Sequence, residues 1–188
     1  SIILSVSIPS NNNTIAVTMS EAVYNTNSGS GSLESSDFSY SISGGTATLS
    51  SSTPTSISKN SNVYTLGLSI SGTPDGAETL VVNPVDDGIF DVVGNESTTS
   101  QSNNSAKLND KVAPGISTAS IDASNNYIDI TLSEGIYSDI NSSSPLVNND
   151  LSLTFRQNNG NASAVSINSL KKNDNTAQGS ASALSGGE

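Results

Sequence analysis

The chain has 188 residues, with 6 Lys and Arg against 17 Asp and Glu, which gives a formal net charge of -11. It contains no Cys, His or Trp, which excludes a disulfide framework, thiol chemistry, a His-based triad and the usual tetrahedral zinc site. So acidic a chain is not expected to bind nucleic acid, and no apolar run approaches the ~18 residues of a membrane helix. No signal peptide is visible, so we expect a mature or excised segment.

The predicted secondary structure is entirely strand. Apolar residues alternate with polar ones in three stretches, which run from Ile15 to Met19, from Phe38 to Ile42 and from Tyr64 to Ile70. A period of two is typical of strands with one buried face, and no stretch of comparable length has a period of 3.6 residues. In chain order, the strands expected in the first part of the chain are 2–8, 14–20, 37–43, 46–50, 62–70, 78–85 and one within 89–108.

The chain also repeats itself. The segment Asn13–Tyr24 aligns with Asn126–Tyr137, an offset of 113 positions, and internal periodicity is the signature of a repeat architecture. The same offset conserves apolar character at the positions expected to face the core, and these pairs are Leu33 with Leu146, Phe38 with Leu151, Tyr40 with Leu153, and Ile42 with Phe155. We therefore expect a repeated sandwich, in which only the inward face is tightly specified.

The predicted domains are a first repeat at 1–110 and a second at 111–188, joined by a short, stiff linker at Leu108–Pro114. The second copy is incomplete, because it has no counterparts of Leu80–Val82 or Asp91–Asn95, and its last residues, Ala183–Glu188, resemble the turn before Glu78. Either the chain is a piece of a longer repeat array, or another chain donates the missing strands.

Four motifs in this order resemble those of bacterial Ig-like repeat domains. They are the Ser-Glu corner at Ser20-Glu21, the Leu33 to Phe38 entry into a strand, the Asp-x-x-Gly-Asn motif at Asp91–Asn95, and the Asp-x-x-Ala-Pro linker at Asp110–Pro114. The resemblance covers the first repeat and most of the second, and it implies tandem Ig-like β-sandwiches. Such domains occur in large surface adhesins, in surface-layer proteins and as accessory modules of secreted polysaccharide-degrading enzymes.

Calcium is the one cofactor that the sequence supports, because it is bound by carboxylate, amide and carbonyl oxygens. The candidate ligands are Glu21, Asp87, Asp91, Asn95, Asp110 and Glu134. In a sandwich, alternate loops gather at one end, so Glu21, the Asp91 loop and Asp110 are expected to converge there. The alternative is that these Asp and Asn residues only form turns.

No pair of carboxylates is marked as catalytic, so the sequence predicts a protein without enzymatic activity. The leading interpretation is a structural or adhesive segment, a stalk or filament repeat, of a long extracellular bacterial surface protein. Its partners would be neighbouring repeats and a surface glycan or protein, with no nucleic acid and no membrane insertion. The alternatives are a module that itself binds a glycan or a protein, with Tyr24 and Tyr137 as the candidate aromatic residues, or an accessory domain of a secreted hydrolase.

Overall fold

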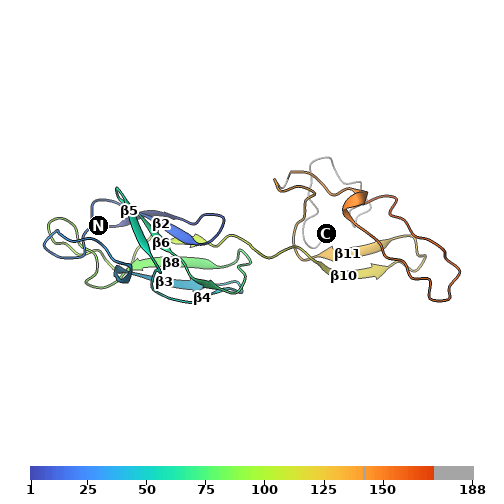
Figure 1. Ribbon diagram of the computed structural model, residues 1–188, viewed down its shortest axis with the longest axis horizontal. Helices are drawn as coiled ribbons and strands as arrows, with labels where there is room; N and C mark the ends of the chain where they lie inside the picture. The colour runs from blue at the N-terminus through green and yellow to red at the C-terminus, as the bar shows by residue number, and fades with distance from the viewer. Residues whose placement is uncertain (142, 172–188) are drawn as a thin grey trace. The chain divides into compact units, whose positions relative to one another are not determined.

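The computed structural model describes residues 1–141 and 143–171. The chain divides into two compact units, Ser1–Val112 and Ala113–Glu188, and the predicted boundary after residue 110 lies close to that division. Among the described residues, regular structure consists of antiparallel strands and two 3-10 turns (Figure 1). The prediction of an all-β chain is therefore confirmed.

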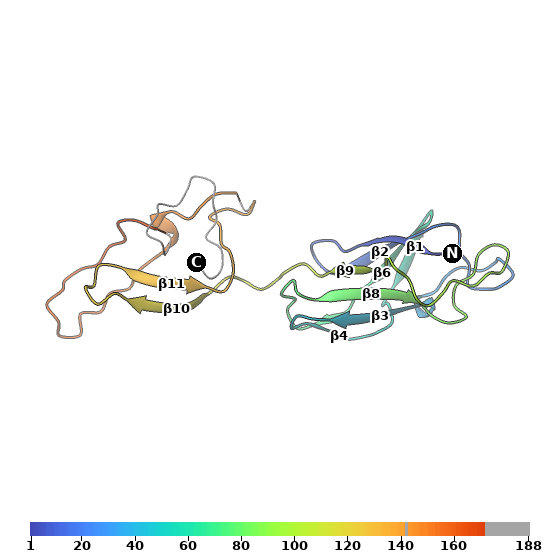
Figure 2. The ribbon, with the colours of Figure 1, turned by 180° about the vertical axis from the view of Figure 1, so that it is seen from behind.

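The first unit consists of two facing sheets and a short two-stranded ribbon. Its elements are β1 (Ile3–Ser7), β2 (Thr14–Met19), η1 (Ser35–Asp37), β3 (Phe38–Ser43), β4 (Thr48–Leu49), β5 (Ile57–Asn60), β6 (Val63–Gly67), β7 (Ile70–Ser71), β8 (Thr79–Pro84) and β9 (Ser105–Lys107). One sheet has the order β1-β2-β6-β5, the second β3-β8-β9, and β4 pairs with β7. Figures 1 and 2 show the two sheets facing one another along the length of the unit.

The core of the first unit lies between these sheets. Every second residue of β2 is buried, as the alternation of the sequence predicts. Every second residue of β8 is also buried, although Leu80, Val81 and Val82 are consecutive apolar residues. The largest fully buried apolar side chains come from both sheets and include Ile15, Tyr64, Phe38 and Leu80. The rings of Phe38 and Tyr64 meet at 6.1 Å between centroids, a favourable separation for a tilted aromatic pair.

Two strand predictions in the first unit differ from the structure. The expected strand 62–70 is broken after Gly67, because the chain passes from β6, which pairs with β2, to β7, which pairs with β4. A Cβ on Gly67 would lie 2.4 Å from Thr55 Oγ1, so this crossing requires a residue without a side chain. Strand β5 was not predicted, because it is an edge strand with a single apolar residue, Ile57, and shows no alternation.

The second unit begins with a strand pair that repeats the first. Strands β10 (Ile116–Ile121) and β11 (Ile128–Leu132) pair antiparallel. A register shift falls between Ile116 and Thr118, 113 positions after the shift between Ile3 and Ser5 in the β1–β2 pair. A 3-10 turn, η2 (Asn148–Asp150), follows at the same offset from η1. The offset seen in the sequence therefore also relates local backbone structure.

After η2, the backbone structure of the second unit no longer matches that of the first. The alignment of Leu151, Leu153 and Phe155 with core residues of β3 predicts a buried strand, but the described residues 151–157 form none. The side chains of Leu153 and Phe155 are 41% and 42% exposed. In the first unit β3 pairs with β8, and no described segment of the second unit takes the part of β8. A strand without that partner leaves its backbone groups unpaired. The predicted turn at Ala183–Glu188 lies outside the described residues.

Candidate functional site

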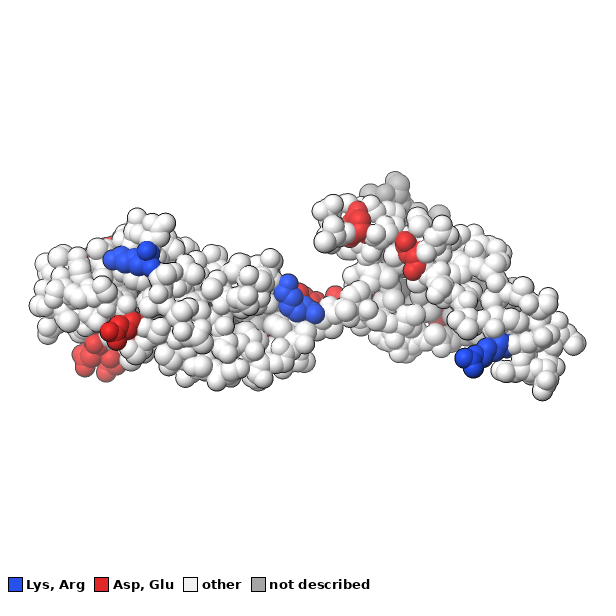
Figure 3. Space-filling view, in the orientation of Figure 1, with Lys and Arg blue, Asp and Glu red and all other residues white. Residues whose placement is uncertain are grey.

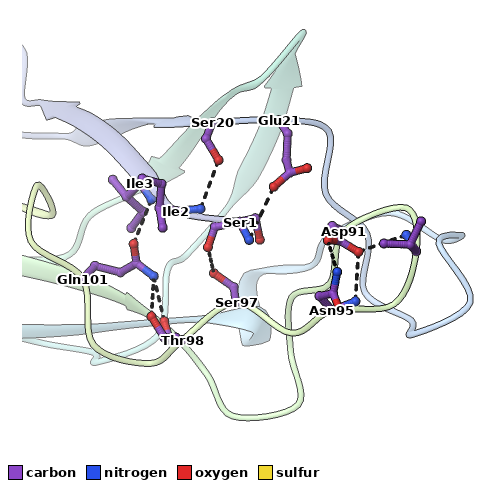
Figure 4. Close-up of polar contacts among 11 residues, drawn as sticks. Ser1, Ile2, Ile3, Ser20, Glu21, Asp91, Asn95, Ser97, Thr98 and Gln101 are labelled. Atoms are coloured by element: carbon purple, nitrogen blue, oxygen red, sulfur yellow. Dashed lines mark hydrogen bonds and ion pairs between the residues drawn. The ribbon is translucent and has the colours of Figure 1, made fainter.

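The end of the first unit at which β1 begins is held by side chains that bind backbone groups (Figure 4). Gln101 Oε1 accepts a hydrogen bond from Ile3 N at 2.8 Å, and Ser97 Oγ donates one to Ser1 O at 2.9 Å. The Ser1 amino group lies 3.4 Å from the carboxylate of Glu21, whose side chain is 47% exposed, so this pair is screened by solvent and contributes little. These contacts fix the first residues of β1 to the segment that precedes β9.

The opposite end is closed by two asparagines. Asn12 Nδ2 donates to Asn109 O at 2.7 Å, and Asn12 Oδ1 accepts from Asn109 N at 2.9 Å. Asn12 is only 5% exposed and has a φ of 57°, a left-handed conformation that Asn tolerates better than most residues. Lys111 N also donates to Pro74 O at 2.8 Å. The segment that leaves β9 is therefore bound to the turn between β1 and β2.

These contacts define the path of the chain through the unit. Strand β1 starts where Ile3 lies opposite Met19 and ends where Ser7 lies opposite Ala16, next to the turn that holds Asn12. The exit segment at Asn109 is bound to that same turn. The chain thus enters the first unit at one end and leaves it at the other, as Figure 2 shows for β1 and β9.

The Asp-x-x-Gly-Asn motif forms a closed turn. Asp91 Oδ1 accepts hydrogen bonds from Val93 N and Asn95 N, both at 2.9 Å, and Asp91 Oδ2 accepts one from Asn95 Nδ2 at 2.8 Å. The hydrogen bond from the Asn95 side chain and those from the backbone hold the pKa of Asp91 below its ordinary value. Gly94 has a φ of 89°, and a Cβ there would lie 2.4 Å from Asn27 O. The motif is therefore explained by turn geometry and close packing.

Glu78 is the one carboxylate with a fully buried side chain among the described residues, at 0% exposure. Its Oε1 accepts hydrogen bonds from Thr46 N at 3.0 Å and Ala47 N at 2.9 Å, and Oε2 accepts from Asp75 N and Gly76 N, both at 3.1 Å. Burial raises the pKa of this carboxyl, but the backbone donors outweigh burial, so its pKa lies below the ordinary value. Glu78 therefore joins the turns before β4 and before β8.

The predicted calcium ligands are not brought together. Glu21 and the Asp91 turn lie towards the entry end, whereas Asp110 Oδ1 accepts a hydrogen bond from Val112 N beside the exit. The predicted convergence of these three residues is therefore wrong, because the exit segment leaves from the end opposite to the Ser-Glu corner. Within residues 1–141 and 143–171, no three acidic residues are grouped so that they could share a metal ion.

The remaining candidate ligands are Asp87, Asn95 and Glu134. Asp87 has a φ of 57°, and its backbone N–H donates to Glu96 Oε1 at 2.7 Å, so it belongs to a turn. Asn95 is bound to Asp91. Glu134, in the second unit, is half-buried, and its Oε1 makes no hydrogen bond within the described part of the chain. A calcium ion needs six to eight oxygens around one point, so binding of calcium by these residues stays a prediction.

One shallow hollow of about 330 Å³ lies near the exit end of the first unit. Its lining is mostly amide and aliphatic, with Asn11, Asn13, Leu68, Ile70 and Lys111 among the residues. No aromatic side chain lines it, and the candidate aromatic residues lie elsewhere: Tyr24 is half-buried and forms a backbone bridge with Phe90, while Tyr137 of the second unit is 40% exposed. Such a hollow offers polar contacts without a ring for stacking.

Charged side chains are sparse on the face of the molecule seen in Figure 3, where most atoms belong to uncharged residues. No helix in the described part of the chain has the length and apolar character needed to cross a membrane. Comparison with protein-family models, with curated proteins and with solved structures found no match.

The residues that close the two ends were missed by sequence reasoning. Asn12, Asn109 and Gln101 stand in polar stretches where Asn and Ser are abundant, so composition gives them no distinction. Glu78 carried a weak signal, since it is an acidic residue between a Pro-Asp-Gly turn and the apolar run Leu80–Val82. The Asp91–Asn95 motif was found, but its carboxylate binds its own turn.

Proposed function

We propose that this chain is a non-catalytic structural segment, a stalk or filament repeat built of tandem Ig-like β-sandwiches. The observation that carries the proposal is the path of the chain, which enters the first unit at the end held by Gln101 and leaves at the end held by Asn12. Units with entry and exit at opposite ends extend with each added copy, as a stalk requires.

The tandem arrangement is supported by local structure that recurs 113 positions later. The hydrogen bond from Glu34 N to Asp37 Oδ2, at 2.7 Å, has its counterpart from Val147 N to Asp150 Oδ2, at 2.8 Å. Asn12 and Asn125 share a φ of 57°. The first unit has antiparallel sheets and spans Ser1–Val112, which supports our proposal of an Ig-like sandwich, a fold of about 100 residues. We infer that the second unit is a further copy of this fold.

The hydrogen-bond partners of the acidic side chains support a non-catalytic role. The acidic residues with clearly lowered pKa values in the first unit are Glu78 and Asp91, and both are occupied by backbone or Asn donors. Neither lines the hollow near the exit. Burial raises the pKa of Asp37, and its carboxylate accepts a hydrogen bond from Glu34 N in the η1 turn. The carboxylates that the fold perturbs in the first unit therefore serve the geometry of turns.

We place the segment outside the cell, on the surface of a bacterium, as the resemblance in the sequence implies. The net charge of -11 and the Ser, Thr and Asn exterior favour solubility and repulsion from other acidic surfaces. Its partners are neighbouring repeats and, at an adhesive tip, a surface glycan or protein. An antibody raised against residues 1–112 is expected to label intact cells of the source bacterium. Labelling only after permeabilisation would contradict this location.

A binding module is the second candidate, and the hollow lined by Asn11, Asn13 and Lys111 favours it. Amide side chains around a shallow depression suit hydrogen bonding to a sugar or a peptide. Saturable binding on a glycan array that is lost in Asn11→Ala together with Asn13→Ala would establish that function. An accessory role beside a catalytic domain of a polysaccharide-degrading enzyme would be established by finding such a domain in the full reading frame.

A further inference from the structure

The hollow of about 330 Å³ near the exit end is built entirely from residues of the first unit. Four parts of the chain line it: the turn between β1 and β2, the crossing from β6 to β7, the turn before β8 and the exit segment. The residues that they contribute include Asn11–Asn13, Leu68–Ile70, Pro74 and Lys111. The volume is at the lower end of the range for small-molecule sites, so it suits a small ligand.

Hydrogen bonds of the backbone fix the walls of this hollow to one another. Leu68 N donates to Asn13 O at 2.9 Å, which joins the β6–β7 crossing to the turn between β1 and β2. Lys111 N donates to Pro74 O at 2.8 Å, which joins the exit segment to the turn before β8. The walls are therefore in place before a ligand arrives, which lowers the cost of ordering them on binding.

Several polar side chains of the lining have no partner in the part of the chain that the structure describes. The amide of Asn13, the hydroxyl of Ser69 and the ammonium group of Lys111 make no hydrogen bond or ion pair there. Asn11 uses only its Oδ1, which accepts from Asn13 N at 3.1 Å, so its NH2 group is free to donate. Together these side chains offer both donors and acceptors to a ligand.

The apolar part of the lining is aliphatic. Leu68 and Ile70 are half-buried and pack against the core of the first unit, so part of each side chain is left to the hollow. Aliphatic surface beside free amide, hydroxyl and ammonium groups matches a sugar ring, which has C–H groups on a face and hydroxyls around its edge.

An extended peptide fits this site less well than a sugar. Strand addition requires backbone groups without partners. In the crossing from β6 to β7, the N–H of Leu68 is bound to Asn13 O, and the carbonyl of Ser69 accepts a hydrogen bond from Ser50 N at 2.9 Å. Ile70 pairs with Leu49. The backbone of this wall is thus already occupied by the fold.

The charge of the molecule disfavours an acidic ligand. The chain has a net charge of -11, which repels anions. In the sequence, Asp75 follows Pro74 and Asp110 precedes Lys111, so two of the lining residues have a carboxylate as their neighbour in the chain. Lys111, in turn, disfavours a cationic ligand. A neutral ligand avoids both penalties.

We propose that this hollow binds a neutral monosaccharide or disaccharide. The hydroxyls of the sugar bond to the amides of Asn11 and Asn13 and to the ammonium group of Lys111, while one face of the ring lies on Leu68 and Ile70. The proposal rests on the binding function given above as the second candidate, and it names the ligand class of that same hollow. It does not depend on the stalk, so either can fail without the other.

Saturation-transfer NMR on the full 188-residue chain tests the proposal. The probes are glucose, galactose, mannose, N-acetylglucosamine and their β-linked disaccharides. We expect at least one probe to receive saturation from the methyl groups of the protein, with weak affinity because no aromatic ring stacks on the sugar. Titration of that probe should shift the backbone amide signals of Asn13, Leu68 and Lys111. No saturation of any probe would overturn both this site and the binding function.

A pair of double variants then separates this site from binding elsewhere. Asn13→Ala with Lys111→Ala removes two exposed side chains that have no partner, so the fold should be kept and affinity for the sugar should fall about tenfold. The matched control is Asn126→Ala with Lys59→Ala, since Asn126 is the counterpart of Asn13 at the 113-residue offset and Lys59 lies on β5. Unchanged affinity in the first variant, or an equal loss in both, would overturn this site and leave a binding function elsewhere on the chain.

Two further probes test the choice of ligand class. Glucuronate should bind more weakly than glucose, because its carboxylate meets a negatively charged protein. Tetraalanine should cause no shift of the Asn13 or Lys111 amide signals. Tighter binding of glucuronate would overturn the choice of a neutral ligand, and shifts with tetraalanine would assign the hollow to a peptide.

Discussion

Asn12 and Asn109 are 97 positions apart in the chain and are joined by reciprocal hydrogen bonds, in which the amide of Asn12 both donates to and accepts from the backbone of Asn109. A third bond runs from Asn109 Nδ2 to Asn12 Oδ1 at 3.0 Å. This pair attaches the exit segment of the first unit to the turn at the end of its first strand.

Removing the side chain of Asn12 should therefore destabilise the first unit. Asn12→Gly keeps the left-handed backbone conformation without strain and removes the side-chain hydrogen bonds. The greater freedom of glycine in the unfolded chain adds to the loss of stability. We expect the free energy of unfolding to fall by about 1–3 kcal/mol. Chemical denaturation followed by circular dichroism measures it, with the exposed neighbour Asn11→Ala as the control. Equal stability of the two variants would show that the asparagine pair is not an anchor.

Glu78→Gln tests the buried carboxylate. In the wild type, the carboxylate accepts hydrogen bonds from backbone N–H groups such as those of Thr46 and Ala47. Glutamine keeps one side-chain oxygen but replaces the other with an NH2 group, which faces backbone donors and cannot accept from them. We expect a loss of about 2–3 kcal/mol, since hydrogen bonds to charged groups are the stronger ones. The exposed Asp86→Asn removes the same charge and should change stability by less than about 0.5 kcal/mol.

The same variant should change the dependence of stability on pH. The pKa of Glu78 is lower in the folded state than in the unfolded state, so the unfolded state binds more protons as the pH falls. The contribution of Glu78 is thus fully present above the unfolded pKa and is lost as the pH falls from that value through the lower folded pKa. The slope of unfolding free energy against pH in that window should be shallower in Glu78→Gln than in the wild type. Parallel slopes would contradict the lowered pKa.

Two glycines provide a test of the Asp91–Asn95 turn. Gly94→Ala places a Cβ 2.4 Å from Asn27 O at a φ of 89°, whereas a Cβ on Gly115 meets nothing within 4 Å. We expect Gly94→Ala to lower the free energy of unfolding by more than about 1 kcal/mol, and Gly115→Ala to leave it unchanged within about 0.5 kcal/mol. Thermal melts of both variants check this. A neutral Gly94→Ala would mean that the two loops are not packed as the structure has them.

Calcium should not stabilise the first unit. Asp91 has both oxygens occupied by its own turn, and Asp110 lies at the other end of the unit. Thermal melts in the presence of calcium and of EDTA are therefore expected to coincide. A rise in melting temperature with calcium would show that Glu21, Asp87 or Asp91 rearranges to bind it.

The sequence predicted those parts of the fold in which one face of a strand is buried. The alternation at Ile15, Val17 and Met19 identified β2 because only inward positions must be apolar. It did not reveal β5, an exposed edge strand, nor the break after Gly67, which depends on a close approach to Thr55 that no local pattern records. The contact of Asn12 with Asn109 is equally non-local, because it depends on which turn the exit segment reaches.

In the second unit, too, a local sequence pattern did not predict the structure. Leu153 and Phe155 keep the apolar alternation of β3, yet the described residues there form no strand. A strand needs a partner as well as a pattern, and the first unit supplies one in β8. The apolar alternation therefore predicted β3 correctly in the first unit and predicted a strand wrongly at residues 151–155 of the second.

The most direct test of the stalk is to pull the chain between its ends by force spectroscopy. Cysteines at Ser1 and at Val112 load β1 along its axis, so its hydrogen bonds to β2 share the force, and unfolding should release about 35 nm of chain. Cysteines at Ser1 and Glu21 attach to neighbouring ends of the β1–β2 pair and open its bonds one at a time. We predict a clearly higher unfolding force for the Ser1–Val112 geometry. Equal forces in the two geometries would contradict a mechanical role for this unit.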